Sequence, residues 1–288
     1  MLLTKHNPAA VTLEIPSKST QRLSVMLTSD VHFDSVICDL ELFTKHLQLA
    51  EEKQAPVLIA GDLLDAMQGK WDPRRQPEKL KEQYKVSAYY DAIVMDIARY
   101  LAKFDIPIYI LALGNHETGV LRHSNTDLLG NVAYQLRVEH GKKAVAMGYW
   151  GYLRFQFRYN KGSHNASKTL YWYHGVSNGA PVTKGMIQAN RQAVWIHDAD
   201  FVLNGHNHKS YTTPQPIERI NQKTMDPYND IVWFLRTPGY MKSSGECQVT
   251  FGFGAEKHRA PTPKGCMFLD MTYHHSGEVE TEILQKIS

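Results

Sequence analysis

Residues 23–28 read Leu-Ser-Val-Met-Leu-Thr and run directly into Ser29-Asp30-Val31-His32. The first run is apolar and β-branched enough for a buried strand. The acid and the histidine follow at the point where this strand ends. Polar side chains at strand ends are where sites form in α/β proteins. The stretch therefore predicts the first strand of a central sheet and the first part of a site.

Two further strands are predicted to end in the same way. The run 56–60 leads into Gly61-Asp62, and the run 107–113 leads into Gly114-Asn115-His116-Glu117. Segments with apolar residues at helical spacing separate the three runs. Right-handed β-α-β crossovers make such strands parallel neighbours, so we expect the three polar clusters at one edge of the sheet.

The residues after this unit predict a second sheet. Aromatic-rich runs at 144–150 and 152–159 are expected to form two strands joined by a tight turn around Gly151. The run 170–173 is a further strand, and it ends at His174-Gly175. This is a fourth polar strand end.

A fifth polar strand end closes the series. The short apolar run 201–203 precedes Asn204-Gly205-His206-Asn207-His208. Two histidines one residue apart can face one point only where the backbone bends tightly, and glycine permits that bend. Taken alone, this run fits a metal site or a surface loop with two solvated histidines.

The order of the elements predicts the architecture. We expect an α/β (α+β) fold, a two-sheet β-sandwich flanked by helices, because the chain shows neither repeats nor an interdomain linker. The whole of 1–288 is expected to form one domain, with the site motifs in 21–210. The C-terminal strands of 211–288 are expected to complete the second sheet.

The composition limits the functional classes. The chain has 288 residues, a formal net charge of +3 and a hydrophobic share of 43%. The charge is too small to indicate a nucleic-acid binder by itself. Three scattered cysteines, at positions 38, 247 and 266, form neither a disulfide framework nor a C-x-x-C motif. No apolar run near the N-terminus is long enough for a signal peptide or a membrane span. We therefore expect a cytoplasmic protein with no membrane partner.

The polar strand ends together form a set of metal ligands: Asp30, His32, Asp62, Asn115, His116, His174, His206 and His208. Imidazole, carboxylate and amide oxygen without thiolate suit divalent ions such as Mn, Fe, Zn or Ni. Eight groups exceed what one tetrahedral ion uses, so two ions are expected, most simply Mn²⁺. Two neighbouring ions can grip a phosphate and lower the pKa of a water molecule. The predicted reaction is metal-assisted hydrolysis of a phosphate ester.

Five motifs follow one another along the chain: Asp-x-His at 30–32, Gly-Asp-x-x-Asp at 61–65, Gly-Asn-His-Glu at 114–117, a lone His at 174 and Gly-His-x-His at 205–208. In this order they resemble the motifs of the calcineurin-like metallophosphoesterases. They span most of the chain, and five motifs in register are far more specific than any one of them. The resemblance implies a helix-flanked β-sandwich with two metals at the ends of its central strands.

The resemblance also implies roles for these residues. One ion would be held by Asp30, His32, Asp62 and His208, and the other by Asp62, Asn115, His174 and His206, with Asp62 bridging. His116 would stay free of metal, contact the phosphate and protonate the leaving oxygen. Asp65 would hold the His116 ring in its orientation. Glu117 is given no role.

The residue after Asp65 bears on the substrate. The protein serine/threonine phosphatases of the family place there an arginine that grips a phosphomonoester, and this chain has Ala66. A basic, proline-containing segment follows at 67–85, including Arg74 and Arg75, and Arg122 and His123 come soon after the third motif. Cations interleaved with aromatics suit a polyanionic strand. This pattern is similar to the DNA-repair exonuclease branch and predicts a phosphodiesterase, a nuclease acting on DNA.

Alternatives stay open at this point. The basic segment fits a solvated loop and the start of a helix equally well, and the chain would then be a phosphomonoesterase or a small-nucleotide phosphodiesterase. From another class, it would be a non-catalytic binding scaffold, although none of the eight ligand-type residues is missing. The remaining histidines, among them His46 on an amphipathic helix, are expected at the surface.

Overall fold

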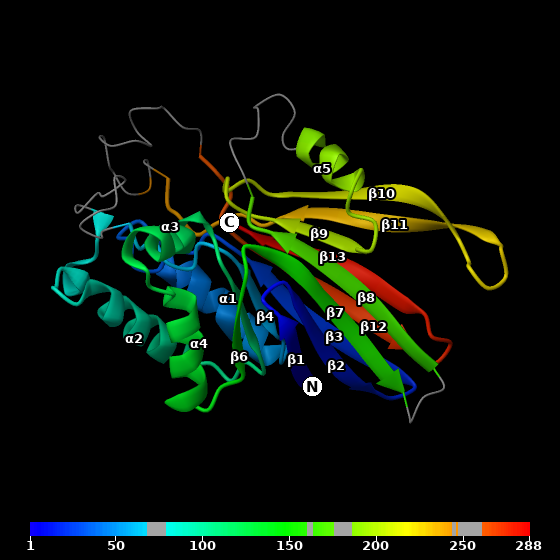
Figure 1. Cartoon of the computed structure of the whole chain (residues 1–288), viewed down its shortest axis with the longest axis horizontal. Coiled ribbons are helices and arrows are strands. Elements are labelled where there is room, and N and C mark those ends of the chain that lie inside the picture. Colours follow the sequence, from blue (N-terminus) through cyan, green and yellow to red (C-terminus); the bar gives the residue numbers. More distant parts are fainter. Residues whose placement is uncertain (68–78, 160–163, 176–185, 244–245, 247–260) are drawn as a thin grey trace.

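The computed structural model describes residues 1–67, 79–159, 164–175, 186–243, 246 and 261–288. Two β-sheets pack face to face, and helices cover their outer faces (Figure 1). The predicted two-sheet sandwich flanked by helices is therefore confirmed.

The six-stranded sheet carries the first three motif-bearing strands at its centre. Its order is β13-β12-β3-β4-β5-β6. Its strands are β3 (Thr20–Thr28), β4 (Val57–Ala60), β5 (Tyr109–Ala112), β6 (Ala144–Met147), β12 (Gly265–His274) and β13 (Val279–Ile287). The four strands from β3 to β6 run parallel, as the alternation of strands and helices predicts. The loops after β3, β4 and β5 consequently open at one edge of the sheet.

The seven-stranded sheet carries the other two motif-bearing strands. Its order is β1-β2-β7-β8-β9-β11-β10. Its strands are β1 (Leu2–Asn7), β2 (Ala10–Ser17), β7 (Trp150–Tyr159), β8 (His164–Tyr173), β9 (Phe201–Asn204), β10 (Tyr211–Ile220) and β11 (Pro227–Arg236). The neighbours β8, β9 and β11 are parallel, so their ends also lie together at one sheet edge.

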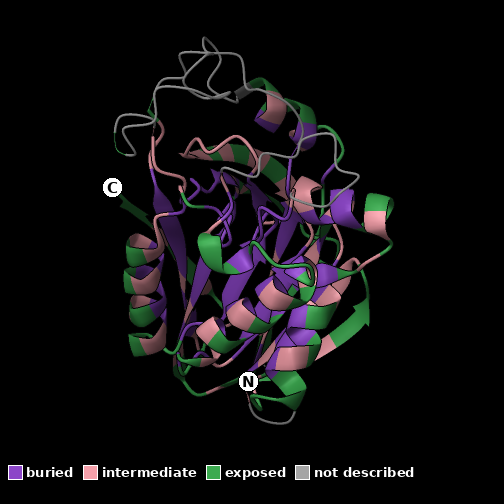
Figure 2. Cartoon of the chain, turned by 90° about the vertical axis from the view of Figure 1, so that its left-hand side faces the viewer, coloured by how far each residue is buried: buried purple, intermediate pink, exposed green. Residues whose placement is uncertain are grey.

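The helices pack on the outer faces of the sheets. They are α1 (Leu40–Glu52), α2 (Tyr89–Ala102), α3 (Asn115–Ser124), α4 (Leu128–Val138) and α5 (Met186–Ala193), with a 3₁₀ turn η2 at Glu82–Tyr84. Helices α1 to α4 lie on the side of the six-stranded sheet, and α5 lies on the seven-stranded sheet (Figure 1). Each helix beside the six-stranded sheet turns a buried stripe inward and an exposed stripe outward (Figure 2).

Apolar side chains on both faces of the strands hold these layers together. Along β4, Val57 and Ile59 join the core under the helices, whereas Leu58 joins the core between the sheets. On the opposite sheet, Phe155 and Trp172 belong to that same inter-sheet core. Complete burial of such a side chain contributes roughly 1.5–3 kcal/mol to folding.

The predicted hairpin at 144–159 is wrong. Strand β6 ends the six-stranded sheet, whereas β7 lies inside the seven-stranded sheet between β2 and β8. Gly151 belongs to β7 and forms no turn between the two runs. A Cβ at this position would lie 2.4 Å from ring atoms of Trp172. Glycine is needed here because the backbone approaches a buried indole.

The prediction for the C-terminal strands is right for one pair and wrong for the other. Strands β10 and β11 do belong to the seven-stranded sheet, but β12 pairs antiparallel with β3 and extends the six-stranded sheet together with β13. Strands β1 and β2 were not predicted, and within 211–288 no separate strand was predicted at the position of β10.

Candidate dimetal centre

The motif loops adopt a backbone conformation that non-glycine residues rarely take. Left-handed φ angles occur at Asp30 (53°), His32 (50°), Asp62 (50°), Ala66 (49°), His206 (74°) and His208 (55°). Each such residue costs on the order of 1–3 kcal/mol and persists only where the surroundings impose it. Because these residues are concentrated in the motifs, we infer that the placement of their side chains, rather than the preferred backbone dihedral angles, determines the conformation of these loops.

One group of ligand-type side chains combines both sheets. Ligand atoms of Asp30, His32 and His208 lie within 4.8 Å of one another. The Nε2 atom of His208 is 3.7 Å from Asp30 Oδ1, and the rings of His32 and His208 are stacked with centroids 5.4 Å apart. This is the group that the resemblance assigns to one ion, apart from Asp62.

A second group forms around Asp62, His174 and His206, whose ligand atoms also lie within 4.8 Å of one another. His174 Nε2 is 3.1 Å from Asp62 Oδ2. The amide oxygen of Asn115 is 3.1 Å from His174 Nε2 and 2.7 Å from His206 Nδ1. His174 Nδ1 donates to the carbonyl of Ala60 at 2.8 Å, which leaves Nε2 as the ligand atom.

His116 lies beside both groups, in the first turn of α3. Its Nδ1 donates to the backbone carbonyl of Asp65 at 2.6 Å and is 3.4 Å from the Asp65 carboxylate. Its Nε2 faces Asp62 Oδ2 at 3.6 Å. Asp65 Oδ1 is also 3.3 Å from His32 Nδ1. Asp65 thus contacts both histidine rings, and its main chain makes the closer contact to His116.

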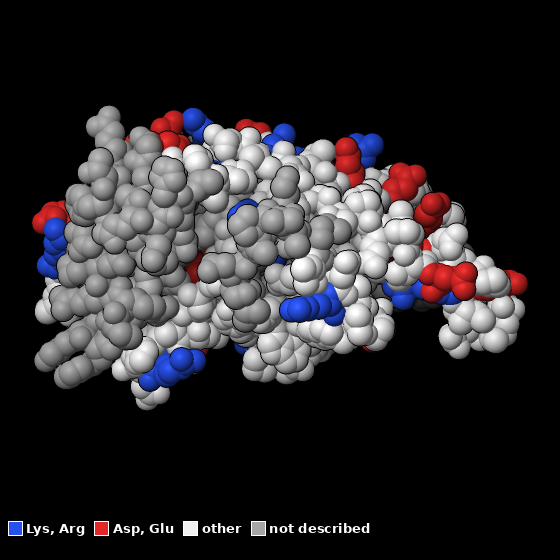
Figure 3. Space-filling view, turned by 90° about the horizontal axis from the view of Figure 1, so that it is seen from above, with Lys and Arg blue, Asp and Glu red and all other residues white. Residues whose placement is uncertain are grey.

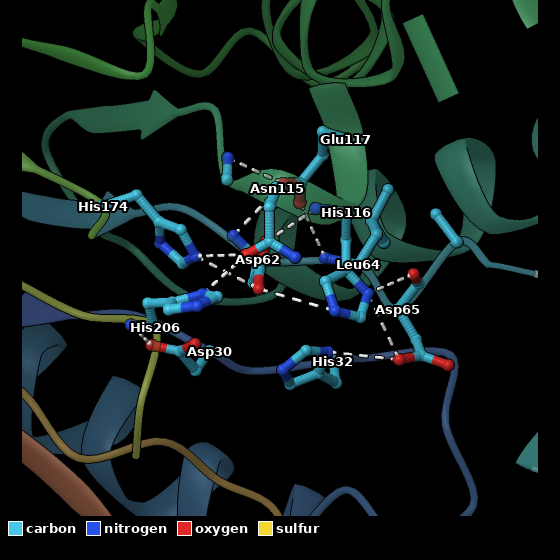
Figure 4. Close-up of polar contacts among 12 residues, drawn as sticks. Asp30, His32, Asp62, Leu64, Asp65, Asn115, His116, Glu117, His174 and His206 are labelled. Carbon is cyan, nitrogen blue, oxygen red and sulfur yellow. Dashed lines mark hydrogen bonds and ion pairs between the residues drawn. The ribbon is translucent and has the colours of Figure 1, made fainter. Parts of the chain in front are cut away.

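Glu117, which had no predicted role, holds two of the motif loops together. Its buried carboxylate accepts hydrogen bonds from the backbone N–H groups of Asp62 (3.1 Å), Leu64 (3.0 Å) and Gly114 (2.9 Å). Burial raises the pKa of Glu117 to about 7, and the nearby Asp62 charge acts in the same direction. Figure 4 shows Glu117 behind the ring of ligand-type side chains, which point toward one another.

Asp34 is a second buried carboxylate that sequence reasoning missed. It accepts hydrogen bonds from the backbone N–H groups of Asp65 (2.6 Å) and Ala66 (3.0 Å) and from the hydroxyl of Tyr89 (2.5 Å). Burial raises the pKa of Asp34, and the charge of Asp65 adds to this effect. The loop after β3 is thereby tied to the loop after β4.

Burial and the nearby carboxylates together raise the pKa of two histidines of the centre and lower that of a third. Burial opposes protonation of His32, but Asp65 and the other carboxylates raise its pKa to about 9. Burial also opposes protonation of His174, whose pKa Asp62 raises to about 10. Burial lowers the pKa of His208 to about 4. A divalent ion would have to displace the protons of His32 and His174, so metal binding is expected to weaken as the pH falls.

The side chains present fit divalent ions. Asp30 Oδ1 and His32 Nε2 are buried and have no hydrogen-bond partner in the described part of the chain. An unsatisfied buried polar atom costs about 1–3 kcal/mol, a cost that ligation removes. Imidazole, carboxylate and amide donors suit Mn, Fe, Zn and Ni alike.

The residues predicted to contact substrate are less well placed. Arg122 and His123 are exposed in the last turn of α3. Arg74 and Arg75 lie outside the described residues. Lys81, from the same basic segment, donates to the carbonyl of Phe33 at 2.5 Å and lies over that ring.

The surface placement expected for His46 is wrong. It is buried, with 8% of its surface exposed, and its Nδ1 is 2.8 Å from the hydroxyl of Tyr240.

A comparison with known families accounts for this geometry. The model of the calcineurin-like phosphoesterase family matches residues 23–236, which contain all five motifs. The chain belongs to the calcineurin-like phosphoesterase family. Membership implies metal-dependent hydrolysis of a phosphate ester and a pair of divalent ions, which agrees with the His and Asp groups described above.

Similarity to individual proteins is distant. The fold is similar to that of GAP50, the anchor in the inner membrane complex of Plasmodium, with a TM-score of 0.46 and 11% identity over 92% of this chain and 84% of that chain. A Thermotoga maritima protein determined by solution NMR has a TM-score of 0.32 and 15% identity over 92% of this chain and 99% of its own. Both TM-scores lie below 0.5, so neither neighbour informs the activity. No curated protein matches the chain.

Proposed function

We propose that this phosphoesterase is a phosphodiesterase and that it cuts DNA. The observation that carries the proposal is Ala66. It is fully buried, and its N–H donates to Asp34, so position 66 presents no cation to a phosphate. A phosphomonoester dianion would lack the arginine clamp there, whereas a diester carries one charge less and needs that clamp less.

The proposed assignment of ligands follows the two groups. Asp30, His32 and His208 would hold one ion, Asn115, His174 and His206 the other, and Asp62 would bridge them. When bound, two divalent ions, which we propose to be Mn²⁺, would polarise the phosphate. They would also lower the pKa of a water molecule towards neutrality, so that it can act as the nucleophile.

His116 is the proposed general acid. Its Nδ1 proton is engaged by the Asp65 carbonyl, so Nε2 is the atom that can exchange a proton with a leaving oxygen. This ring edge faces the centre beside Asp62 and is partly accessible, with 12% of its side chain exposed. Asp65 would keep the ring in this orientation.

A small-nucleotide phosphodiesterase is the second candidate. On the face seen from above, the described basic and acidic side chains are both scattered, and the described basic ones do not gather into one continuous patch (Figure 3). Such mixed charge favours a compact substrate over a long polyanion. The basic segment that favours DNA, with Arg74 and Arg75, lies mostly outside the described residues.

A substrate panel tests the proposal. Protein loaded with Mn²⁺ would be offered an aryl phosphomonoester, the matching diester, single- and double-stranded DNA, and cyclic and linear nucleotides. The proposal expects faster cleavage of the diester than of the monoester, together with cleavage of DNA. Intact DNA and a preferred monoester would contradict it, and turnover of nucleotides alone would favour the second candidate.

Metal analysis separates an enzyme from a binding scaffold. An enzyme is expected to carry two transition-metal ions per chain and to lose activity on His116→Ala. A metal-free and inert protein would instead be a scaffold.

We also propose a cytoplasmic location and a single domain over 1–288. Cys38 and Cys266 are free thiols, which supports a reducing compartment. No helix in the described part of the chain is long and apolar enough to cross a membrane.

A further inference from the structure

A buried arginine ends strand β11 on the face of the seven-stranded sheet that α5 covers. Arg236 has 1% of its surface exposed. Phe234, two residues earlier, packs in the apolar cluster with α5, whereas Leu235 between them faces the other sheet. The guanidinium therefore lies outside the sandwich, on the opposite side of the sheet from the inter-sheet core.

The guanidinium has fewer partners than donors. Its Nη2 donates to the side-chain oxygen of Gln188 on α5, and its Cζ lies 4.8 Å above the ring of Tyr211. Its Nε and Nη1 are buried without a hydrogen-bond partner in the described residues, and so is the hydroxyl of Tyr211. We call Arg236, Tyr211 and Gln188 the Arg236 cluster.

The polar side chains next to this cluster are neutral and already engaged. Asn204, which pairs with Arg236 across the strands, exchanges two hydrogen bonds with Gln192 at 2.9 and 3.0 Å. Gln188 donates to the same Asn204 oxygen at 3.1 Å. By contrast Arg219, at the other end of the β10–β11 pair, has a carboxylate partner, Asp230, at 2.9 Å.

An unpaired buried charge is unfavourable by several kcal/mol. Burial lowers the pKa of Arg236, while Tyr211 and Asp30 favour its charged form. Asp30 is a proposed metal ligand, so divalent ions in the centre would take up that negative charge. The loaded protein would then hold a buried cation with even less compensation.

We propose that the Arg236 cluster binds a phosphate oxyanion. Within the described part of the chain, two guanidinium nitrogens and a phenolic hydroxyl have no hydrogen-bond partner, and charge-assisted hydrogen bonds to phosphate are the contacts that arginine makes best. Tyr211 and Gln188 are only partly buried, so the cluster has a side that borders solvent. The oxyanion satisfies the buried donors and neutralises the guanidinium.

Short segments of chain connect the Arg236 cluster to the candidate metal centre. Arg236 pairs with Asn204, and His206 follows two residues later, at most about 7 Å of chain. Thr237, next to Arg236, is 2.8 Å from the hydroxyl of Ser29, which donates to Asp30. The phosphate is therefore either free in solution or part of a substrate strand beside the scissile group. Only the latter source rests on the proposed nuclease function.

Calorimetric titration with inorganic phosphate tests the site independently of catalysis. The protein would be titrated both with Mn²⁺ bound and after chelation. Chelation removes the binding of phosphate to the metal ions and leaves only the binding of phosphate to the Arg236 cluster. A chelator-resistant binding event is expected, weakened roughly tenfold or more by Arg236→Gln and several-fold by Tyr211→Phe. Arg219→Gln, the matched control, should bind as the wild type does.

Unfolding measurements guard against a merely misfolded variant. Without phosphate, Arg236→Gln should unfold at the same or a higher midpoint than the wild type, and added phosphate should stabilise only the wild type. If Arg236→Gln does not fold, Tyr211→Phe, which keeps the ring under the guanidinium, carries the test. Absence of chelator-resistant binding, or phosphate binding that neither variant alters, overturns the proposal.

Kinetics then distinguish the two sources of phosphate. If the cluster holds a phosphate of the substrate strand, Arg236→Gln raises KM for an oligonucleotide several-fold more than KM for a small aryl diester. Equal changes in both KM values indicate that the site takes free phosphate. If the protein has no nuclease activity, this kinetic comparison cannot be made and the proposed nuclease function is wrong. The phosphate titration then still tests whether the site exists.

Discussion

The two halves of the candidate metal centre are held in place by different means. In the half that follows β3, β4 and β5, the carboxylates of Asp34 and Glu117 bind backbone N–H groups of the motif loops. In the half that follows β8 and β9, His174 donates to the carbonyl of Ala60 and the N–H of His206 donates to Asp30. Each half has its own backbone hydrogen bonds, from Asp30 to Gly61 in the first and from Gly205 to His174 in the second, but among the described residues the buried carboxylates brace the loops of the first half.

This difference indicates which residues the whole centre depends on. A change in the first half should disturb ligands on both sheets, whereas a change in the second half should remain local. Asp62 is the strongest case, because its carboxylate contacts His116 and His174 and it lies between the two groups.

Asp62→Asn should therefore have the largest effect. The variant keeps the shape of the side chain and loses the charge shared by both groups, so we expect loss of both ions and a fall in phosphoesterase activity of at least about 10³-fold. Elemental analysis and the kcat for an aryl diester measure these effects. Asp105→Asn, at an exposed site, is the control. A variant that keeps two ions and near-normal activity would refute the bridging role.

His206→Asn and His208→Asn should each remove one ion, and not the same one. Activity is expected to fall by about 10²-fold in each case, because one of two charges that stabilise the transition state is lost. Combination with His32→Asn separates the sites. The His208 and His32 double variant should still bind one ion, whereas the His206 and His32 double variant should bind none. The same metal count in both double variants would contradict the split.

Asp34→Asn should have a smaller effect, because it acts through Asp65. The substitution replaces one of the two acceptor oxygens with an amide NH2 group and removes the charge, which loosens the loop that orients His32 and His116, so metal affinity or activity is expected to fall by roughly 10- to 100-fold. As a positioning residue, Asp34 should also alter the pH profile of kcat through His116. Tyr89→Phe should have the same effect in weaker form.

Tyr84→Phe is the matched control for this series, since Tyr84 bonds to Asp96 in the same way. Equal losses in Tyr84→Phe and Tyr89→Phe would indicate a general packing defect rather than positioning of Asp65.

The first half of the centre was predictable from sequence because its strands alternate regularly with helices. Helix α3 was missed, since Asn115, His116 and Glu117 are polar and follow a strand directly. Glu117 accepts from the N–H of Gly114, three residues earlier, and this spacing between an N-cap and an acid is a recognisable sign of a helix start. The ligands themselves followed from five motifs in order.

Other features depend on contacts between distant residues and leave no local pattern. Asp34 accepts from Tyr89, 55 residues away, and His46 bonds to Tyr240, 194 residues away. Strand β10 was missed because it contains Pro214 and Pro216, which are compatible with an edge strand but argue against a central one. The sequence could not show that β10 forms the edge of the seven-stranded sheet.

His46 gives the smallest expected effect, on stability. Burial lowers its pKa to about 4, Lys286 acts in the same direction, and Asp39 opposes. Because the folded pKa lies below the ordinary value of 6.5, the neutral ring contributes stability fully above about pH 6.5, and this contribution is lost as the pH falls towards 4. The loss is expected to be roughly 1–3 kcal/mol.

Urea unfolding of chelated protein at pH 7.5 and 4.5 measures this term without metal linkage. His46→Gln should lose less stability between the two pH values than the wild type, and His140→Gln, at an exposed position, should match the wild type. Tyr240, the partner of His46, donates its N–H to the carbonyl of Asp30 at 2.9 Å. Protonation of His46 should therefore also loosen the first half of the centre. If the free energy of unfolding of His46→Gln changed with pH as much as that of the wild type, the neutral His46 ring would not contribute to stability.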